Sequence, residues 1–235
     1  MGSRFNKRVV LVAGGTGGLG EAVVLAFLNE GASVHVTYRS EDGFSRLKKA
    51  AGESTGSLIG HRAELTDHNQ TAAVIQAIGQ LDVIVNAIGG YAGGSALWET
   101  SPETFDRMMS LNVRSGFLLA RNAIPAMIRQ GAGVFINISS RAAVDHAAGA
   151  SAYAAAKAAA VAMMDSLAAD LKGKGVRVNT VLPSIIDTQA NREAMPGADF
   201  TKWPKPEEIA DVILFLSTDE SRLIHGASIP VYGTN

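Results

Sequence analysis

The sequence predicts an α/β fold, in which a single domain is built on a doubly wound parallel sheet of about seven strands flanked by helices. Three observations predict it. Short β-branched apolar runs alternate with amphipathic segments along the chain. The first two runs are joined by a glycine-rich turn and a helical pattern. The length of 235 residues suits one large domain with a sizeable core.

The opening segment carries this pattern most clearly. Residues 7–13 are predicted to form a buried strand, and glycines follow at positions 14, 15, 17, 18 and 20. Residues 21–31 then form an amphipathic helix that ends at Gly31, and residues 32–38 form the second strand. A strand, a glycine-rich turn, a helix and a second strand in this order are typical of a nucleotide-binding unit.

The rest of the chain continues the alternation. Further strands are predicted at residues 57–61, 81–86, 134–139, 175–182 and 229–232. Helices are predicted at residues 43–51, 67–79, 101–129, 151–172 and 206–216. The segment 184–206 interrupts this rhythm, because it is long and contains three prolines with Met195, Phe200 and Trp203. A connection of that length is usually functional, so we predict that it forms a lid over the substrate.

Composition and charge limit the kinds of partner. The net charge is −1, with neither a basic tract nor an acidic tail, so nothing predicts binding to nucleic acid or to a membrane surface. The chain has no cysteine, which excludes disulfides and thiolate catalysis. No two of the five histidines are four residues apart, so we predict no metal site. The first apolar run ends at once in glycines, unlike a signal peptide, and we expect a cytoplasmic protein.

Tyr153 and Lys157 are the first catalytic candidates. They lie in the alanine-rich run 151–172, and their spacing of four places them one turn apart on the same helix face. A free tyrosine has a pKa of about 10, and a neighbouring ammonium favours the phenolate. The pair therefore predicts a proton donor whose pKa is lowered by the lysine. An exposed aromatic side chain beside a solvated charge gives the same spacing, so the rest of the chain has to decide.

The glycine turn supplies the second candidate site. Gly14, Gly18 and Gly20 stand between a predicted strand and a predicted helix. Glycines there let the main chain approach a pyrophosphate, and the following helix directs its N-terminus at the phosphates. A flexible tight turn is the alternative, but the position behind a strand and before a helix favours phosphate binding.

Taken together, these features resemble the short-chain dehydrogenase/reductase family over nearly the whole chain. Five matches occur in the family's order: the glycine turn, a segment similar to Asn-Asn-Ala-Gly, the Asn that holds a water next to the Lys, a Ser before the Tyr, and a segment similar to Pro-Gly-x-x-x-Thr. In this sequence they are Gly14 to Gly20, Asn86-Ala87-Ile88-Gly89, Asn112, Ser140, and Pro183-Ser184-Ile185-Ile186-Asp187-Thr188. Ser140 stands thirteen residues before Tyr153, and Ser184 replaces the family's Gly.

The resemblance implies a Rossmann-type NAD(P)-binding domain over residues 1–235 and hydride transfer between a nicotinamide and a carbonyl or alcohol carbon. It implies that Tyr153 gives or takes the proton and that Ser140 hydrogen-bonds the substrate oxygen. Lys157 would lower the Tyr pKa and bind the nicotinamide ribose, and Asn112 would anchor a proton relay. Ser139 competes for the serine role, but the spacing favours Ser140.

The resemblance also implies a set of residues around NADP(H), which we predict in preference to NAD(H). The second strand ends in Tyr38-Arg39-Ser40, without the acid that would hold a ribose 2′-hydroxyl. Arg39 can form a bidentate hydrogen bond with a 2′-phosphate, and Ser40 can donate a hydrogen bond to it. The nearby acids Glu41 and Asp42 weaken this preference. The full predicted set is Gly14, Thr16, Gly18, Leu19, Gly20, Arg39, Ser40, Glu64, Leu65, Asn86, Ala87, Gly89, Tyr153, Lys157, Pro183, Ile186 and Thr188.

The substrate remains open between two enzymatic readings. The lid segment LPSIIDTQANREAMPGADFTKW is similar to that of dihydropteridine reductases, whereas Ser140 and the absence of an acid after the second strand favour an ordinary carbonyl reductase. The candidates for the substrate pocket are Tyr91, His146, Asp187, Arg192 and Trp203.

We therefore expect an NADPH-dependent reductase of a ketone or aldehyde. The alternatives are a pterin reductase and a catalytically silent, NADP-binding regulatory protein. The helical segments 112–129 and 151–172 carry apolar residues on too many sides for one buried face. Helices of this kind often pair between subunits in the family, so we expect a homodimer or homotetramer.

Overall fold

One parallel sheet forms the centre of the computed structural model, which describes residues 4–233 without the side chains of residues 53, 55 and 56. Within that range the sheet has seven strands in the order β3-β2-β1-β4-β5-β6-β7, and every neighbouring pair is parallel. The strands are β1 (Val9–Ala13), β2 (Ser33–Tyr38), β3 (Leu58–Arg62), β4 (Val83–Asn86), β5 (Gly133–Ile138), β6 (Val176–Pro183) and β7 (Ser228–Val231). The predicted fold class is confirmed.

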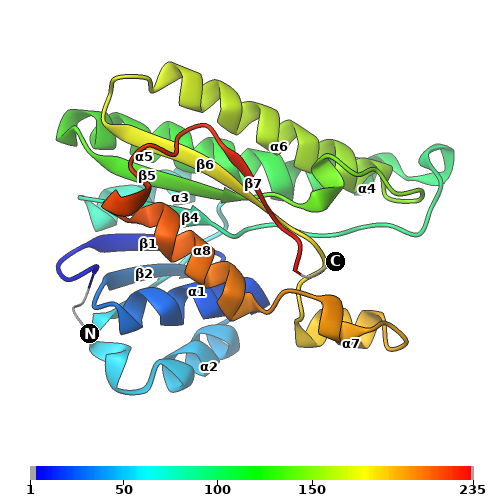
Figure 1. Cartoon of the computed structure of the whole chain (residues 1–235), viewed down its shortest axis with the longest axis horizontal. Coiled ribbons are helices and arrows are strands. Elements are labelled where there is room, and N and C mark those ends of the chain that lie inside the picture. Colours follow the sequence, from blue (N-terminus) through cyan, green and yellow to red (C-terminus); the bar gives the residue numbers. More distant parts are fainter. Residues whose placement is uncertain (1–3, 234–235) are drawn as a thin grey trace.

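Helices cover both faces of the sheet (Figure 1). They are α1 (Gly18–Asn29), α2 (Glu41–Ala51), α3 (His68–Ile78), α4 (Pro102–Met109), α5 (Ser115–Gln130), α6 (Ser151–Asp170), α7 (Gln189–Ala194) and α8 (Pro206–Ser217). On one face α1 and α8 pack on buried valines and isoleucines of the strands. On the other face α3, α5 and α6 enclose a second apolar cluster. This burial of both sheet faces explains why the strands read as continuous apolar runs rather than alternating ones.

The strand order reverses direction between β1 and β4, which makes the carboxyl ends of these two strands the expected binding crevice. The main-chain segments at the ends of β1 and β4 contact each other there, because the Ala87 N–H donates to the Ala13 carbonyl oxygen at 2.9 Å. Gly14 has a φ of +79°, and a Cβ on it would lie 3.2 Å from Ala87 main-chain atoms. The glycine turn and the segment after β4 therefore meet at the switch point.

In two segments the secondary structure differs from the prediction. The helical region predicted at 101–129 is broken by a π-helical turn, Ser110–Arg114, between α4 and α5. The predicted lid at 184–206 is not simply a loop, because it contains α7 and a short 3₁₀ turn, Phe200–Lys202. Thr188 stabilises the start of α7, because its hydroxyl caps the helix by accepting the Asn191 N–H. Among residues 4–233, no helix is long and apolar enough to span a membrane.

Candidate active site

The glycine turn is shaped to leave main-chain groups open at the start of α1. A Cβ on Gly20 would lie 2.2 Å from the Gly14 carbonyl oxygen, so no larger residue fits there. The N-cap position is Gly17, which offers no side-chain cap, and the first N–H groups of α1 remain for a ligand. Thr37, which the sequence did not single out, fixes the turn because its hydroxyl accepts the Gly14 N–H at 3.1 Å. These features fit a bound pyrophosphate.

The two serines at the end of β5 have different surroundings. The Ser139 hydroxyl is buried and donates to the Lys157 carbonyl oxygen at 2.9 Å, so it ties β5 to α6. The Ser140 hydroxyl is only partly buried, accepts the Ala142 N–H at 3.2 Å, and hydrogen-bonds the Tyr153 phenol. The geometry therefore favours Ser140 over Ser139 as the serine that reaches a substrate.

Tyr153 lies in the first turn of α6, partly buried beside Ser140. Its ring packs edge-on against Tyr91, with centroids 5.0 Å apart and an interplanar angle of 75°. Burial raises the pKa of the phenol, while the hydrogen bond with Ser140 acts in the opposite direction. The pKa of the Tyr153 phenol is therefore raised, whereas the spacing to Lys157 predicts a lowered value. The physical reason is that desolvation of the phenolate outweighs the attractions around it.

Lys157 lies one turn further along α6 and is buried. Its ammonium donates to the Ile138 carbonyl oxygen at 3.2 Å and lies 5.8 Å from the centre of the Tyr153 ring. Burial lowers the pKa of Lys157 from its ordinary value of 10.5 to about 8. The lysine therefore stays charged at neutral pH, close to the point where it loses its proton.

Asn112 is positioned by the π-helical turn. Its amide nitrogen donates to the Gly90 and Met108 carbonyl oxygens at 3.1 and 3.0 Å, and its amide oxygen accepts the Gly90 N–H at 3.2 Å. A Cβ on Gly89 would lie 2.9 Å from that amide oxygen and 3.2 Å from the Lys157 ammonium. Asn112, Gly89 and Lys157 thus converge, as the sequence predicts. The π-helical turn places the side chain, in agreement with the frequent use of such turns at functional sites.

The end of β2 presents a cation to solvent. The Arg39 side chain is 74% exposed, and its guanidinium lies 3.6 Å from the Glu64 carboxylate. Ser40 caps α2 by accepting the Gly43 N–H at 3.4 Å, and its hydroxyl hydrogen is left for another acceptor. Thr16 of the glycine turn lies against Gly43. Arg39, Ser40 and Thr16 are therefore grouped at one end of the crevice.

Three of the predicted cofactor residues have inward-facing side chains. The Asn86 amide donates to Asn137 at 2.9 Å and accepts the Ile88 N–H at 3.4 Å. Leu19 and Leu65 belong to the two hydrophobic clusters. These side chains fix the strand ends, and only main-chain atoms of these residues remain for a ligand. Sequence patterns do not show whether a residue contacts a ligand through its side chain or only through its main chain.

The segment after β6 closes over the glycine turn. A Cβ on Gly18 would lie 2.8 Å from the Thr188 methyl group, which brings the two predicted cofactor segments into contact. The Ile186 carbonyl accepts the Thr188 N–H and the Asn191 amide, both at 2.8 Å. Pro183 ends β6 beside Val231 of β7. The crevice is thus bounded by segments that are far apart in the sequence.

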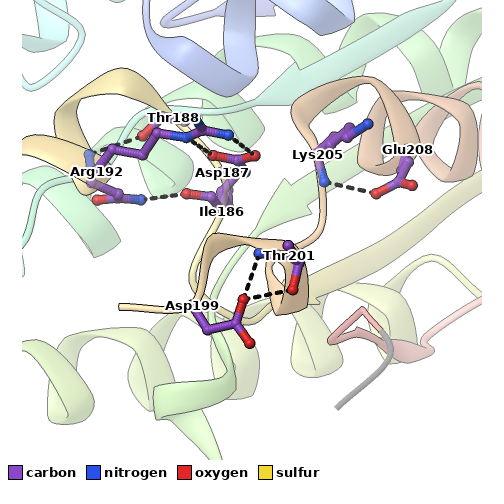
Figure 2. A network of polar contacts seen from close by, with 9 residues as sticks. Ile186, Asp187, Thr188, Arg192, Asp199, Thr201, Lys205 and Glu208 are labelled. Carbon is purple, nitrogen blue, oxygen red and sulfur yellow. Dashed lines mark hydrogen bonds and ion pairs between the residues drawn. The ribbon is translucent and has the colours of Figure 1, made fainter. Parts of the chain in front are cut away.

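The substrate-pocket candidates fall into three places. Asp187, Arg192 and Trp203 line a cavity of about 1040 Å³ under the lid, and Figure 2 shows the polar contacts that surround it. Tyr91 lines a smaller cavity of about 400 Å³ next to the start of α6. His146 lines neither cavity: it is exposed, and its ring lies 3.1 Å from the Ala142 carbonyl oxygen. Its predicted place in the substrate cleft is not supported, because it lies in an exposed loop turned toward its own main chain.

Sequence spacing also missed a pair of histidines. His35 on β2 and His61 on β3 share a hydrogen bond of 2.8 Å between Nδ1 and Nε2, and burial lowers the pKa of both. They are 26 residues apart, and only the pairing of β2 with β3 brings them together. Among the side chains that the structure describes, which leave out residue 53, no group of three or more His, Asp or Glu is arranged to hold a metal ion.

The family model described as short chain dehydrogenase matches residues 8–199. The chain belongs to the short-chain dehydrogenase family. It is 31% identical to the 3-oxoacyl-[acyl-carrier-protein] reductase FabG of Thermotoga maritima, with 98% of each chain covered. It is 30% identical to the meso-2,3-butanediol dehydrogenase of Serratia marcescens, covering 98% of this chain and 95% of that one.

Solved structures of the family have the same fold. The crystal structure of levodione reductase matches with a TM-score of 0.90 at 26% identity, covering 97% of each chain. A structure described as ElxO with NADP bound matches with a TM-score of 0.90 at 24% identity, covering 97% of this chain and 98% of that one. This short-chain dehydrogenase is accordingly an oxidoreductase that acts on CH–OH or C=O groups.

Proposed function

We propose that this short-chain dehydrogenase is an NADPH-dependent reductase that converts a ketone or aldehyde to an alcohol, reversibly. The observation that carries the proposal is the convergence of Ser140, Tyr153, Lys157 and Asn112 at the carboxyl ends of the strands. A silent regulatory protein that only binds the dinucleotide needs none of these contacts. The names of the relatives support carbonyl chemistry, since both describe reactions of a carbonyl or a secondary alcohol.

Each of these four side chains has a separate role in the proposed reaction. A bound nicotinamide supplies the hydride. The Ser140 hydroxyl hydrogen-bonds the carbonyl oxygen of the substrate, where negative charge develops. Tyr153 donates its proton to that oxygen, and its raised pKa keeps the phenol protonated for this task. Lys157 carries a positive charge beside the phenolate that results, and Asn112 holds the main chain at Gly90 next to it.

The preference for NADPH rests on Arg39. Its guanidinium is exposed at the end of β2, beside the Ser40 hydroxyl, where a 2′-phosphate requires a positive charge and hydrogen-bond donors. Glu64 opposes this preference, because its carboxylate already attracts Arg39 at 3.6 Å. We expect Arg39→Ala to raise the KM for NADPH about tenfold and to leave that for NADH within about twofold. An equal effect on both cofactors would contradict the assignment.

The function is tested with a panel of carbonyl compounds. The protein is mixed with NADPH and each compound, and the loss of nicotinamide absorbance at 340 nm is followed, with NADH as the parallel cofactor. Turnover of at least one ketone or aldehyde supports the proposal. Failure of the whole panel with both cofactors would reject it.

A pterin reductase is the second candidate, favoured by the similarity of the lid sequence over residues 182–203 to dihydropteridine reductases. Quinonoid dihydropterin is therefore included beside the simple ketones. Faster turnover of the pterin than of every ketone would make it the substrate. The presence of the Ser140 hydroxyl next to Tyr153 favours the ketones.

The proposal includes one domain with the 184–206 lid above the substrate, and an assembly of two or four chains. Apolar side chains on α4 and α5 support pairing, because Phe105 and Phe117 are 45% and 47% exposed. Sedimentation at micromolar concentration tests the assembly, and a monomer would contradict it. The reaction needs only a small-molecule substrate, and we propose a cytoplasmic location without nucleic acid or membrane partners.

A further inference from the structure

The turn that follows Ser140 lies at the surface, and hydrogen bonds join its own residues. It comprises the 3₁₀ turn Arg141–Ala143 and the exposed residues that continue it to His146. The Ser140 hydroxyl accepts the Ala142 N–H at 3.2 Å, and the Ser140 carbonyl accepts the Ala143 N–H at 2.9 Å. The direction of the Ser140 hydroxyl therefore depends on the shape of this turn.

One side chain of the turn extends to the end of β7. The Arg141 guanidinium lies over the Tyr232 ring, 5.3 Å from its centre, a distance at which a cation is attracted to an aromatic face. The same guanidinium pairs with Asp145 of its own turn, with 2.9 Å between Nη2 and Oδ2. Arg141 therefore joins the turn that carries Ser140 to the residue that follows β7.

Tyr232 itself is anchored to the segment that follows β6. Ser184, which replaces the family's glycine, donates its hydroxyl to the Tyr232 carbonyl at 2.9 Å and its N–H to the Val231 carbonyl at 3.2 Å. A glycine has no hydroxyl and could donate only the second of these bonds. Figure 1 shows the end of β7 beside the segment that leads from β6 to α7. The serine thus gives this chain an anchor for Tyr232 that a glycine does not provide.

The residue after Tyr232 packs against the lid. Gly233 has a φ of +80°, and a Cβ on it would lie 2.8 Å from the Lys202 carbonyl oxygen. The main chain is therefore held on both sides of Tyr232, by Ser184 and by the lid. The last residues of a chain are well ordered where contacts of this kind tie them down. A ring on such a backbone can hold the Arg141 side chain in one place.

We propose that Tyr232 is a positioning residue for the reaction and acts on the substrate through Arg141 and Ser140. Its ring holds the turn in the shape in which the Ser140 hydroxyl meets the carbonyl oxygen of the substrate. Ser184 contributes by anchoring the main chain of Tyr232. The catalytic part of this inference rests on the reductase function proposed above, whereas the hold of Tyr232 on the turn does not.

Hydrogen exchange tests this hold without any turnover. Tyr232→Leu removes the ring, and Tyr232→Phe keeps it. By mass spectrometry, we expect amide exchange of residues 142–145 to be at least about fivefold faster in Tyr232→Leu and within about twofold of the unmodified protein in Tyr232→Phe. Exchange in α8 should stay the same in both variants. Unchanged exchange of the turn in Tyr232→Leu would overturn the inference, and so would an equal acceleration in α8, which indicates a general loss of structure.

Kinetics then test the route through Ser140. Tyr232→Leu should lower kcat for a ketone about tenfold and leave the KM for NADPH within about twofold, and Tyr232→Phe should restore kcat. In a Ser140→Ala background, Tyr232→Leu should lower kcat by less than about twofold, because the effects of residues that act as one unit do not add. Phe215→Leu, at an exposed phenylalanine of α8, is the control and should leave kcat unchanged.

The two experiments separate this inference from the proposed function. A loss of kcat that persists in full in the Ser140→Ala background would overturn the inference and leave the reductase function standing. Faster exchange of the turn in a protein that reduces no carbonyl compound would support the hold by Tyr232 and reject the reductase function.

Discussion

Two regions of the proposed active site are held in place by different kinds of contact. We call Ser139, Ser140, Tyr153 and Lys157 the floor, and residues 184–206 are the lid. On the floor, buried side chains bond to main-chain atoms of strands and helices, as Lys157 does to Ile138 and Ser139 to Lys157. In the lid, side chains bond chiefly to one another within one segment, as the exposed Arg192 does to the partly buried Asp187 and Phe200. Groups fixed by the core keep their geometry without ligand, whereas the lid contacts can rearrange locally. The floor is thus suited to chemistry and the lid to the choice of substrate.

The largest effect is expected at the floor. Tyr153→Phe removes the proton donor and keeps the ring against Tyr91, so kcat should fall by about 10³-fold while the affinity for NADPH changes by less than about twofold. Stopped-flow or steady-state rates and a fluorescence titration of NADPH check the two parts. Tyr91→Phe is the matched control, because it removes a phenol from the other ring of the same contact and should retain most of kcat. Retained turnover in Tyr153→Phe would refute the mechanism.

Much of the floor could be predicted from the sequence, because its residues depend on local patterns. Tyr153 and Lys157 are one helical turn apart, and the glycine turn follows a strand directly, so spacing alone brings these residues together. The choice of Ser140 over Ser139 also agrees with the structure, where the Ser139 hydroxyl is used inside the protein.

The remaining features depend on contacts between distant segments. The π-helical turn that places Asn112 has no pattern of its own in the sequence, and the pKa of Tyr153 depends on burial that sequence does not report. In the lid, Arg192 and Trp203 line the same cavity, but their link through Phe200 appears only in three dimensions. The place of His146 in the substrate cleft stays a prediction, because nearness in sequence to Ser140 and Tyr153 does not fix the direction of the exposed loop that carries it.

A second prediction separates chemistry from stability within the floor. Ser140→Ala should lower kcat by about 10²-fold, because it removes the hydrogen bond to the substrate oxygen. Ser139→Ala instead leaves the buried Lys157 carbonyl without that partner and should lower the free energy of unfolding by about 1–3 kcal/mol. Urea denaturation and steady-state kinetics on both variants check this. The reverse pattern would make Ser139 the catalytic serine.

The pH dependence tests how strongly the floor buries its lysine. The pKa of Lys157 is about 8 in the folded chain against an ordinary value of 10.5, so the ammonium is charged below about pH 8 and neutral above it. We expect kcat/KM for reduction to fall by up to about tenfold per pH unit above 8. A flat profile to pH 9.5, after correction for cofactor loss, would contradict a catalytic charge at this position.

The same shift has the opposite effect on stability. Because the folded pKa lies below the unfolded one, the fold gains free energy as pH rises from about 8 to about 10.5, by a total of about 3 kcal/mol from this group. The gain is lost as pH falls from about 10.5 to about 8, and below about 8 this group no longer changes the stability with pH. Lys157→Met removes this contribution, so the difference in unfolding free energy between the two proteins, measured from pH 7 to 10, isolates it.

The smallest effect is expected in the lid. Asp187→Asn removes one charge of the pair that holds Arg192 against Phe200, and the pair is exposed on the arginine side. Exposed ion pairs stabilise a fold little, so Tm should change by about 1 °C or less, while the KM for the carbonyl substrate should rise by about three- to fivefold with kcat retained. Glu30→Gln, which breaks the Arg4–Glu30 pair outside the lid, is the matched control and should leave the KM unchanged. A fall in kcat equal to that of the floor variants would mean that lid and floor act as one unit, and the contrast between them would be lost.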